Sequence, residues 1–303
     1  MIDNVRLFVS DKHRFEERIE NKGIMELTNK LSILTGEVME YPKKGSDSNL
    51  QISINKNSAT ILGSLHKYKN LLWENGEQNY DDFNLSQIQE VILGLIKKYD
   101  IEKDTVLTNL EFGFNLTVSN DPKTIIDSNV LMNNFKSANK NLKFSGSGDY
   151  KEFQLTDYRI KIYNKSKQFK LKDNILRVEL KIIQKRMLQK LGINCLEDLL
   201  DKEVLKRIFM LFMEKFEGLI IVDDFDSNGI PDNDYNKLNK YTNPSYWIKV
   251  KSKKSPRVVS GLKKDFLILL AKYELLSTKK QIREKLESKF LELIEVETYK
   301  KVA

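Results

Sequence analysis

A segment in the middle of the chain, residues 157–181, alternates apolar and polar residues twice, and this pattern constrains the fold more than any other feature. Each half places three apolar side chains on one face of a predicted strand: Tyr158, Ile160 and Ile162 in the first, and Leu176, Val178 and Leu180 in the second. Turn-forming residues at 172–174 separate the halves, so the segment is predicted to be a β-hairpin with a long loop. The opposite, polar faces carry Tyr163, Arg177 and Glu179. A purely structural hairpin does not need a nucleophile, a cation and a carboxylate together, whereas a phosphoryl-transfer site does.

The rest of the hydrophobic pattern predicts an α+β fold. Alternation indicates further strands at residues 5–9, 51–55, 60–65 and 106–118, and helical periodicity indicates helices at 84–99 and 123–138. We therefore expect a central antiparallel β-sheet with flanking helices, followed by a basic, mainly helical C-terminal region. Residues 145–148 are expected to form a flexible turn and not a phosphate-binding loop, because no Lys-Ser/Thr pair follows them.

Glu111 lies on the polar face of the predicted strand 106–118. On a half-buried sheet, a carboxylate in such a place is ordinarily a solvated outward residue. Its combination with Glu179, a second carboxylate at the centre of a polar strand face, favours another interpretation. Two carboxylates on adjacent strands repel each other unless a cation lies between them.

Composition limits the class of protein. The chain has 303 residues, of which 40% are hydrophobic, enough for one large or two modest domains. A single cysteine, Cys195, excludes an intramolecular disulfide framework and a multi-cysteine zinc site. The sequence shows neither a signal-peptide pattern nor an apolar run of membrane-spanning length. These features predict a soluble, cytoplasmic protein without a membrane partner.

Charge is unevenly distributed along the chain. The net charge is +8, yet residues 236–303 hold 17 Lys or Arg and only 7 Asp or Glu, so the positive excess is confined to the C-terminal fifth. Aromatic residues at 241, 246 and 247 are interleaved with basic residues, which favours contact with a nucleic-acid backbone over a merely solubilising tail. The candidate DNA-binding residues are Lys249, Lys251, Lys253, Lys254 and Arg257.

The same charge pattern suggests a division of the chain into three parts. We predict a catalytic domain at residues 1–222, an acidic linker at 223–235 and a basic DNA-binding region at 236–303. Two amphipathic helices are predicted within 256–297, with a break near 277–278. They could form a helix-turn-helix against DNA, or they could pack on the protein core, and the pattern favours neither.

The run Arg159-Ile-Lys-Ile-Tyr163-Asn-Lys165, followed by Arg177-Val-Glu179-Leu, resembles the signature of rolling-circle replication initiators. The resemblance is to the trans-acting plasmid initiator family and its phage and plasmid relatives. The segment from Leu110 to Asn115, which contains Glu111, resembles an acidic strand motif of the same family. The resemblance covers residues 63–192 and depends on short motifs.

This resemblance implies a metal-dependent DNA nicking-joining endonuclease. Tyr163 would attack a phosphodiester, form a 5′-phosphotyrosyl bond and release a 3′-OH for a polymerase. Lys165 would lower the pKa of the phenol or hold the phosphate, and Arg177 would contact the phosphate. A divalent ion, Mg²⁺ or Mn²⁺, would polarise the phosphoryl oxygens. The ligands that the resemblance implies for it are Glu111, Glu179 and His66. His66 would replace an acidic residue of the family at the end of a predicted strand.

Several alternatives stay open from the residues alone. Tyr163 has no advantage over Tyr158 as the nucleophile, and a lone histidine such as His66 is as consistent with packing as with metal ligation. The His-hydrophobe-His motif of other nicking enzymes is absent, because His13 and His66 are 53 positions apart.

The resemblance also implies partners. These are DNA with an origin hairpin that is single-stranded at the nick, a host helicase and a second copy of the chain in a homodimer. A mobilisation relaxase would share the reaction but act at a different DNA site. A non-catalytic DNA-binding repressor would need the basic C-terminal region but neither Tyr163 nor a metal.

Overall fold

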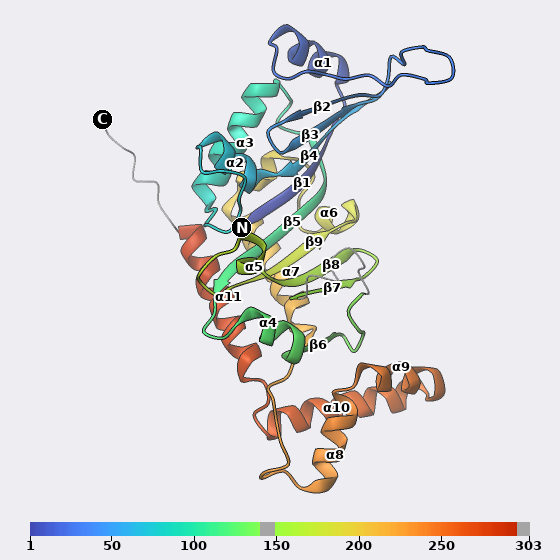
Figure 1. The fold of residues 1–303 in the computed structure, drawn as a ribbon, viewed down its shortest axis with the longest axis vertical. Coiled ribbons are helices and arrows are strands. Elements are labelled where there is room, and N and C mark those ends of the chain that lie inside the picture. Colours follow the sequence, from blue (N-terminus) through green and yellow to red (C-terminus); the bar gives the residue numbers. More distant parts are fainter. Residues whose placement is uncertain (140–148, 296–303) are drawn as a thin grey trace, which may run out of the picture.

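The computed structural model describes residues 1–139 and 149–295. In this part of the chain, the main feature is an eight-stranded sheet in the order β2-β3-β4-β1-β5-β9-β8-β7 (Figure 1). All of its neighbouring strands are antiparallel. The strands are β1 (Ile2–Val9), β2 (Lys43–Asp47), β3 (Leu50–Ile54), β4 (Ala59–Ser64), β5 (Val106–Thr117), β7 (Tyr150–Gln154), β8 (Tyr158–Asn164) and β9 (Ile175–Ile182). A separate antiparallel pair joins β6 (Val130–Asn133) to β10 (Leu219–Ile221).

Helices accompany the sheet and form the C-terminal region. Those in the first two thirds of the chain are α1 (Lys12–Asn21), α2 (Leu65–Leu72), α3 (Leu85–Tyr99), α4 (Pro122–Thr124), α5 (Lys165–Phe169), α6 (Lys185–Lys190) and two short non-α helices, Ile125–Asn129 and Glu197–Leu200. The others are α7 (Lys202–Glu217), α8 (Asp232–Tyr241), α9 (Pro244–Lys253), α10 (Pro256–Lys272) and α11 (Ser277–Glu295). The expected α+β class, with an antiparallel sheet, flanking helices and a helical C-terminal region, is confirmed.

One face of the sheet packs against helices, and the other face is polar. Phe112 and Phe114 of β5 point to the helical side, where their rings contact Phe212 of α7 at centroid distances of 6.0 and 5.4 Å. Phe290 of α11 joins this layer by stacking on Phe209 at 4.0 Å. Glu111 directly precedes Phe112 in β5. Because side chains alternate along a strand, Glu111 points to the opposite, polar face.

The central hairpin forms as predicted, with β8 and β9 paired along their length. The predicted helix at 123–138 is wrong beyond Asn129. The chain is helical through α4 and the π-helix Ile125–Asn129, but Val130–Asn133 forms β6, which pairs with β10 almost ninety residues later in the chain. Local periodicity could not reveal this distant partner. The turn expected at residues 145–148 lies outside the described residues.

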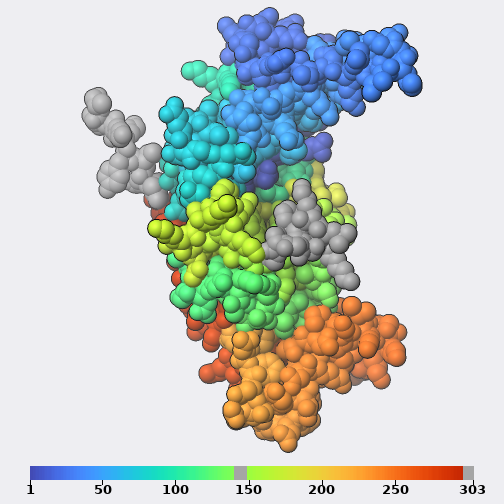
Figure 2. Space-filling view, viewed as in Figure 1, coloured from blue at the N-terminus to red at the C-terminus, as the bar shows by residue number. Residues whose placement is uncertain are grey.

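The C-terminal helices divide between two cores. Helices α8–α10 enclose a second apolar cluster at one end of the molecule, whereas β2 and α1 lie at the other end (Figures 1 and 2). Helix α11 returns to the main core, and its basic residues Lys279 and Arg283 pair with Glu217 of α7 at 3.2 and 3.5 Å. This agrees with the packing alternative for the last helix. The division at 223–235 stays a prediction, although α8 already begins at Asp232.

The aromatic residues of the basic region contribute to its core. Tyr241 and Trp247 are buried, and the Trp247 indole Nε1 donates to the Tyr241 carbonyl at 2.7 Å. The expectation that these rings serve a nucleic-acid backbone is therefore wrong for these two residues, because their faces are covered by apolar neighbours such as Phe266.

Gly113 of β5 is required by the close approach of β9. A Cβ atom at this position would lie 2.6 Å from the Val178 carbonyl oxygen and 2.9 Å from the Glu179 Cα. We expect Gly113→Ala to lower the free energy of unfolding by about 1–3 kcal/mol in urea denaturation. Gly94→Ala is the control, because a Cβ on this exposed position of α3 meets nothing within 4 Å. It should raise the free energy by about 0.5–1 kcal/mol. Equal midpoints for Gly113→Ala and the wild type would contradict this assignment.

Candidate metal and phosphoryl-transfer site

A cleft of about 730 Å³ lies on the polar face of the sheet. It is lined by residues of β1, β5, β7, β8, β9 and α5 and of the segment before α3. Its lining residues include Asp3, Asn79, Glu111, Tyr150, Lys161, Tyr163, Lys165 and Glu179. Segments that are far apart in the sequence, from Asp3 to Lys181, therefore meet at this cleft.

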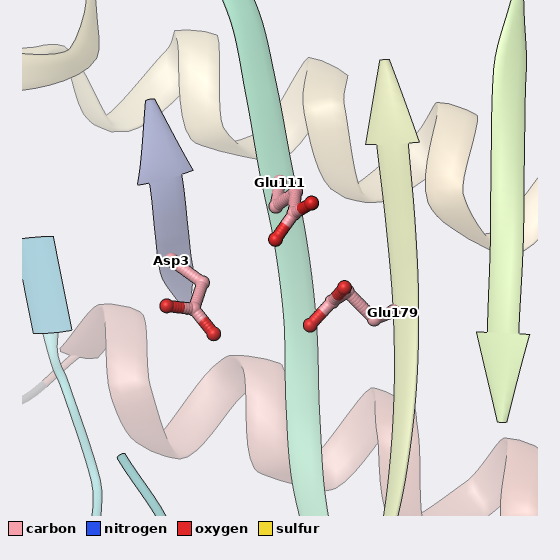
Figure 3. A group of neighbouring side chains, drawn as sticks. All are labelled: Asp3, Glu111 and Glu179. Atoms are coloured by element: carbon pink, nitrogen blue, oxygen red, sulfur yellow. The ribbon is translucent and has the colours of Figure 1, made fainter. Parts of the chain in front are cut away.

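Three buried carboxylates gather in the cleft. One oxygen from each of Asp3, Glu111 and Glu179 lies within 4.8 Å of the others (Figure 3). The residues come from the adjacent strands β1, β5 and β9, and Figure 3 shows the helices on the far side of the sheet. Gly113 of β5 faces Glu179 of β9 in the strand register. Because Gly113 has no side chain, the Glu179 side chain has room beside β5.

Cationic side chains compensate the carboxylates. Arg177 donates from Nη2 to Asp3 at 2.8 Å and from Nε to Glu179 at 3.0 Å, and its Nη1 donates to Asn115 at 3.0 Å. Lys161 Nζ lies 2.7 Å from Glu179 Oε1 and 3.2 Å from Glu111 Oε1. Burial opposes ionisation of Glu179, but Lys161 and Arg177 together outweigh it and hold the pKa of this carboxyl below its usual range.

Tyr163 is placed beside this cluster. Its hydroxyl donates to Glu179 Oε2 at 3.4 Å, and its ring lies 5.9 Å from that of Tyr150 on β7. Burial, and then the negative charge of Glu179, raise the pKa of the Tyr163 phenol well above its ordinary value. Tyr158 lies on the opposite face of β8, where it is buried and Lys215 of α7 lies 5.3 Å from its ring.

Lys165 lies next to Tyr163 but not on the strand as expected. β8 ends at Asn164, whose side chain caps α5, and Lys165 is the first residue of that helix. Its ammonium donates to Asn79 Oδ1 at 2.6 Å and lies 5.4 Å from the centroid of the Tyr163 ring. Burial, and then the positive charge of Arg177, lower the pKa of Lys165 to about 7.

His66 is not at the end of a strand. β4 ends at Ser64, which caps α2, so that His66 lies in the first turn of this helix. Its Nε2 bonds to Asp81 at 2.7 Å and its ring stacks on Phe83. Within the described residues, His66 is not one of the side chains whose ligand atoms converge on the carboxylate cluster. The structure thus separates it from Glu111 and Glu179.

His66 makes a pH-dependent contribution to stability. Burial, above all, lowers the pKa of its imidazole to about 4, from 6.5 in the unfolded chain. Between these values the unfolded chain binds more protons, so stability is full above pH 6.5 and is lost as the pH falls towards 4, by about 3 kcal/mol. We expect His66→Gln to flatten urea midpoints across this window, and His13→Gln, at an exposed position, to leave the wild-type slope. Equal slopes in both variants would contradict the assignment.

The candidate DNA-binding residues lie elsewhere. All five are exposed, on α9, the connection after it and the start of α10. They are Lys249, Lys251, Lys253, Lys254 and Arg257. Figure 1 places α9 and α10 beyond the end of the sheet, so these residues are not part of the cleft. Lys251 Nζ donates to the Phe135 carbonyl at 2.8 Å.

Among the residues of the site that the sequence did not indicate are Asp3 and Lys161. Asp3 lies at the start of a strand whose pattern shows mainly its core face, and Lys161 lies within the motif around Tyr163. Alternation offered a signal for Lys161, because it shares a face with Tyr163. For Asp3 the signal is weaker, since β1 has an irregular register between Ile2 and Val5.

The donor set of the cluster fits a hard divalent cation. Asp3, Glu111 and Glu179 supply only carboxylate oxygens, which Mg²⁺ and Mn²⁺ prefer over thiolate or thioether ligands. The Asn4 amide, which donates to Glu111 Oε2 at 2.7 Å, orients one of the carboxylates. These three residues could therefore hold a metal ion.

Comparisons with known proteins add a structural similarity. The sequence matches no family model, and no curated protein matches it significantly. A rolling circle replication initiator protein from Geobacillus stearothermophilus is similar in structure, with 13% identity and a TM-score of 0.40. The match covers 77% of this chain and 89% of that protein. No helix in the described residues has the length and apolar character that crossing a membrane requires.

Proposed function

We propose that this protein nicks one DNA strand by tyrosine transesterification and initiates rolling-circle replication of a plasmid or phage. One observation carries the proposal. The Tyr163 hydroxyl lies 3.4 Å from Glu179, in a cleft where three carboxylates converge within 4.8 Å of one another. The motifs around Tyr163 and Arg177, which resemble those of replication initiators, support the same reading.

The reaction exchanges one ester for another. The Tyr163 hydroxyl loses its proton as its oxygen forms a bond to phosphorus, the bond from phosphorus to the 3′-oxygen breaks, and the leaving 3′-oxygen takes up a proton, so that no net proton is gained or lost. The products are a 5′-phosphotyrosine and a free 3′-OH. Glu179 accepts the hydrogen bond of the phenol and so orients the nucleophile. A bound Mg²⁺ or Mn²⁺ would supply stabilisation of the negative charge that develops on the phosphoryl oxygens.

Two cations have distinct roles in this proposal. The three guanidinium nitrogens of Arg177 each donate to a protein acceptor, so Arg177 fixes Asp3 and Glu179 in place. Lys165 stands beside the phenol ring, and its lowered pKa of about 7 leaves both protonation states populated near neutrality. In its protonated form, the Lys165 ammonium would hold the phosphate as a cation.

The basic surface of α9 and α10 is assigned to duplex or hairpin DNA near the nick. Its exposed lysines suit phosphate contacts, which depend strongly on salt. The substrate would be an origin hairpin that is single-stranded at the cleavage point, and a homodimer and a host helicase complete the proposed assembly. These partners follow from the family resemblance.

A covalent-adduct experiment tests the function. The purified protein is incubated with labelled single-stranded oligonucleotides from its own genetic neighbourhood, with Mn²⁺ or with EDTA, and is then denatured. We expect a shifted band only with Mn²⁺, and a phosphotyrosine in the tryptic peptide that contains Tyr163. Tight metal-independent duplex binding without an adduct would instead identify a DNA-binding repressor. An adduct formed only with a mobilisation site would identify a relaxase.

A further inference from the structure

The carboxylate cluster already holds a cation of the protein's own. Lys161 extends from β8 across the strand register to Glu179, and its Nζ lies 2.7 Å from Glu179 and 3.2 Å from Glu111. The ammonium is thus close to two of the three residues that could hold a metal ion. Two carboxylates on adjacent strands need such a cation between them to stay ionised while buried.

Among the cations around the cluster, Lys161 is the one that bonds to both Glu111 and Glu179 and can also reach solvent. Arg177 makes three hydrogen bonds and its side chain is 2% exposed, so moving it would break a buried network. The Lys161 side chain is 16% exposed and lines the open cleft. A lysine is a point charge on a flexible stem and can reach solvent without disturbing β8. Lys181 is more exposed, at 27%, but among the described contacts it bonds to Glu111 and not to Glu179, so it does not bridge the two carboxylates.

We propose that Lys161 is a resident counter-ion that competes with the divalent cation for Glu111 and Glu179. A metal ion and the ammonium favour the same carboxylate oxygens, so binding of the metal displaces Lys161 into the cleft. There the ammonium faces the phosphate of the substrate. Lys161 therefore keeps the empty site stable and sets the metal affinity at a modest value. This inference rests on the proposed metal-dependent function and adds the control of metal occupancy.

Direct metal binding tests the competition without any catalytic readout. The Kd for Mn²⁺ is measured by electron paramagnetic resonance for the wild type, Lys161→Met and Lys67→Met. Lys67 also lines the cleft, but it pairs with Glu77 at 2.9 Å, so its replacement removes the same charge without touching the carboxylates. We expect Lys161→Met to bind Mn²⁺ about tenfold more tightly than the wild type, and Lys67→Met to stay near the wild type. A Kd for Lys161→Met that equals or exceeds that of the wild type overturns the proposal, as does an equal gain in both variants.

A second variant keeps the test decisive if Lys161→Met fails to fold without metal. Lys161→Arg retains the positive charge. The arginine guanidinium binds carboxylates in a bidentate geometry, so we expect a metal ion to displace it less readily than the lysine ammonium. We expect weaker Mn²⁺ binding and a smaller rise in Tm on adding Mn²⁺ than in the wild type. Equal or tighter binding by Lys161→Arg overturns the competition. If Mn²⁺-dependent adducts form but none of these shifts occurs, the inference fails while the proposed function stands. Absence of adducts removes the function itself.

Discussion

Replacing Tyr163 by phenylalanine is expected to abolish the covalent protein–DNA adduct and to lower strand cleavage by about four orders of magnitude or more. The substitution removes only the hydroxyl, whose oxygen becomes the ester oxygen in the proposed reaction. The ring stays in the cleft beside Tyr150, so the fold and DNA binding should be retained. Cleavage of a labelled oligonucleotide and a denaturing adduct gel measure the effect, and the melting temperature checks the fold.

Two other tyrosines serve as matched controls for this variant. Tyr150 faces the same cleft, where its hydroxyl donates to Glu152 at 2.7 Å, and Tyr158 lies in the core on the opposite face of the sheet. We expect Tyr150→Phe and Tyr158→Phe to form the adduct at rates within about tenfold of the wild type. If Tyr163→Phe formed an adduct that one of the other two variants lost, the nucleophile would be reassigned to that residue.

Replacing Arg177 by methionine is expected to lower the free energy of unfolding by about 3–5 kcal/mol. The guanidinium is buried and joins Asp3 to Glu179 through bonds of 2.8 and 3.0 Å. Its loss leaves two buried carboxylates with less compensation, although the apolar stem keeps a similar volume. Urea denaturation near neutral pH measures the change. Because protonated carboxyls need no counter-ion, the deficit should shrink as the pH is lowered.

The control for Arg177 is an arginine on the surface. Arg186 pairs with Asp157, and its side chain is 65% exposed. We expect Arg186→Met to change the free energy of unfolding by less than about 1 kcal/mol, because exposed ion pairs contribute little. A loss in Arg177→Met as small as that in Arg186→Met would show that the cluster does not depend on the guanidinium.

Local sequence patterns determined the sheet faces around the site. In β8 and β9, alternation alone assigns Ile160, Ile162 and Val178 to the core, and it assigns Tyr163 and Glu179 to the polar face. The pleat of a strand fixes these directions whatever its neighbours are. The same reasoning placed Glu111 correctly on β5, because Phe112 and Phe114 could not both be buried otherwise.

Short-range signals were less reliable at the ends of elements. His66 was expected at the end of a strand. Instead, the Ser64 side chain accepts a hydrogen bond from the Lys67 backbone N–H at 3.0 Å and caps α2, so that His66 is the second residue of this helix. Lys165 was likewise expected on β8 but is the first residue of α5, because Asn164 caps this helix. Serine and asparagine are good N-caps, but their side chains can equally stay on a strand or turn. Contacts beyond the segment decide between these outcomes.

The composition of the carboxylate cluster was decided by tertiary structure alone. Asp3 meets Glu111 and Glu179 because β1 and β9 both pair with β5, across separations of more than one hundred and of about seventy residues. The ammonium of Lys161 reaches the cluster because β8 pairs with β9 in a register that faces it to Glu179. The sequence thus determined which side chains are polar and, where alternation is regular as in β5, β8 and β9, which way the strand turns them. It could not determine which strands are neighbours, because strand order results from burying all apolar faces at once and leaves no local period to read.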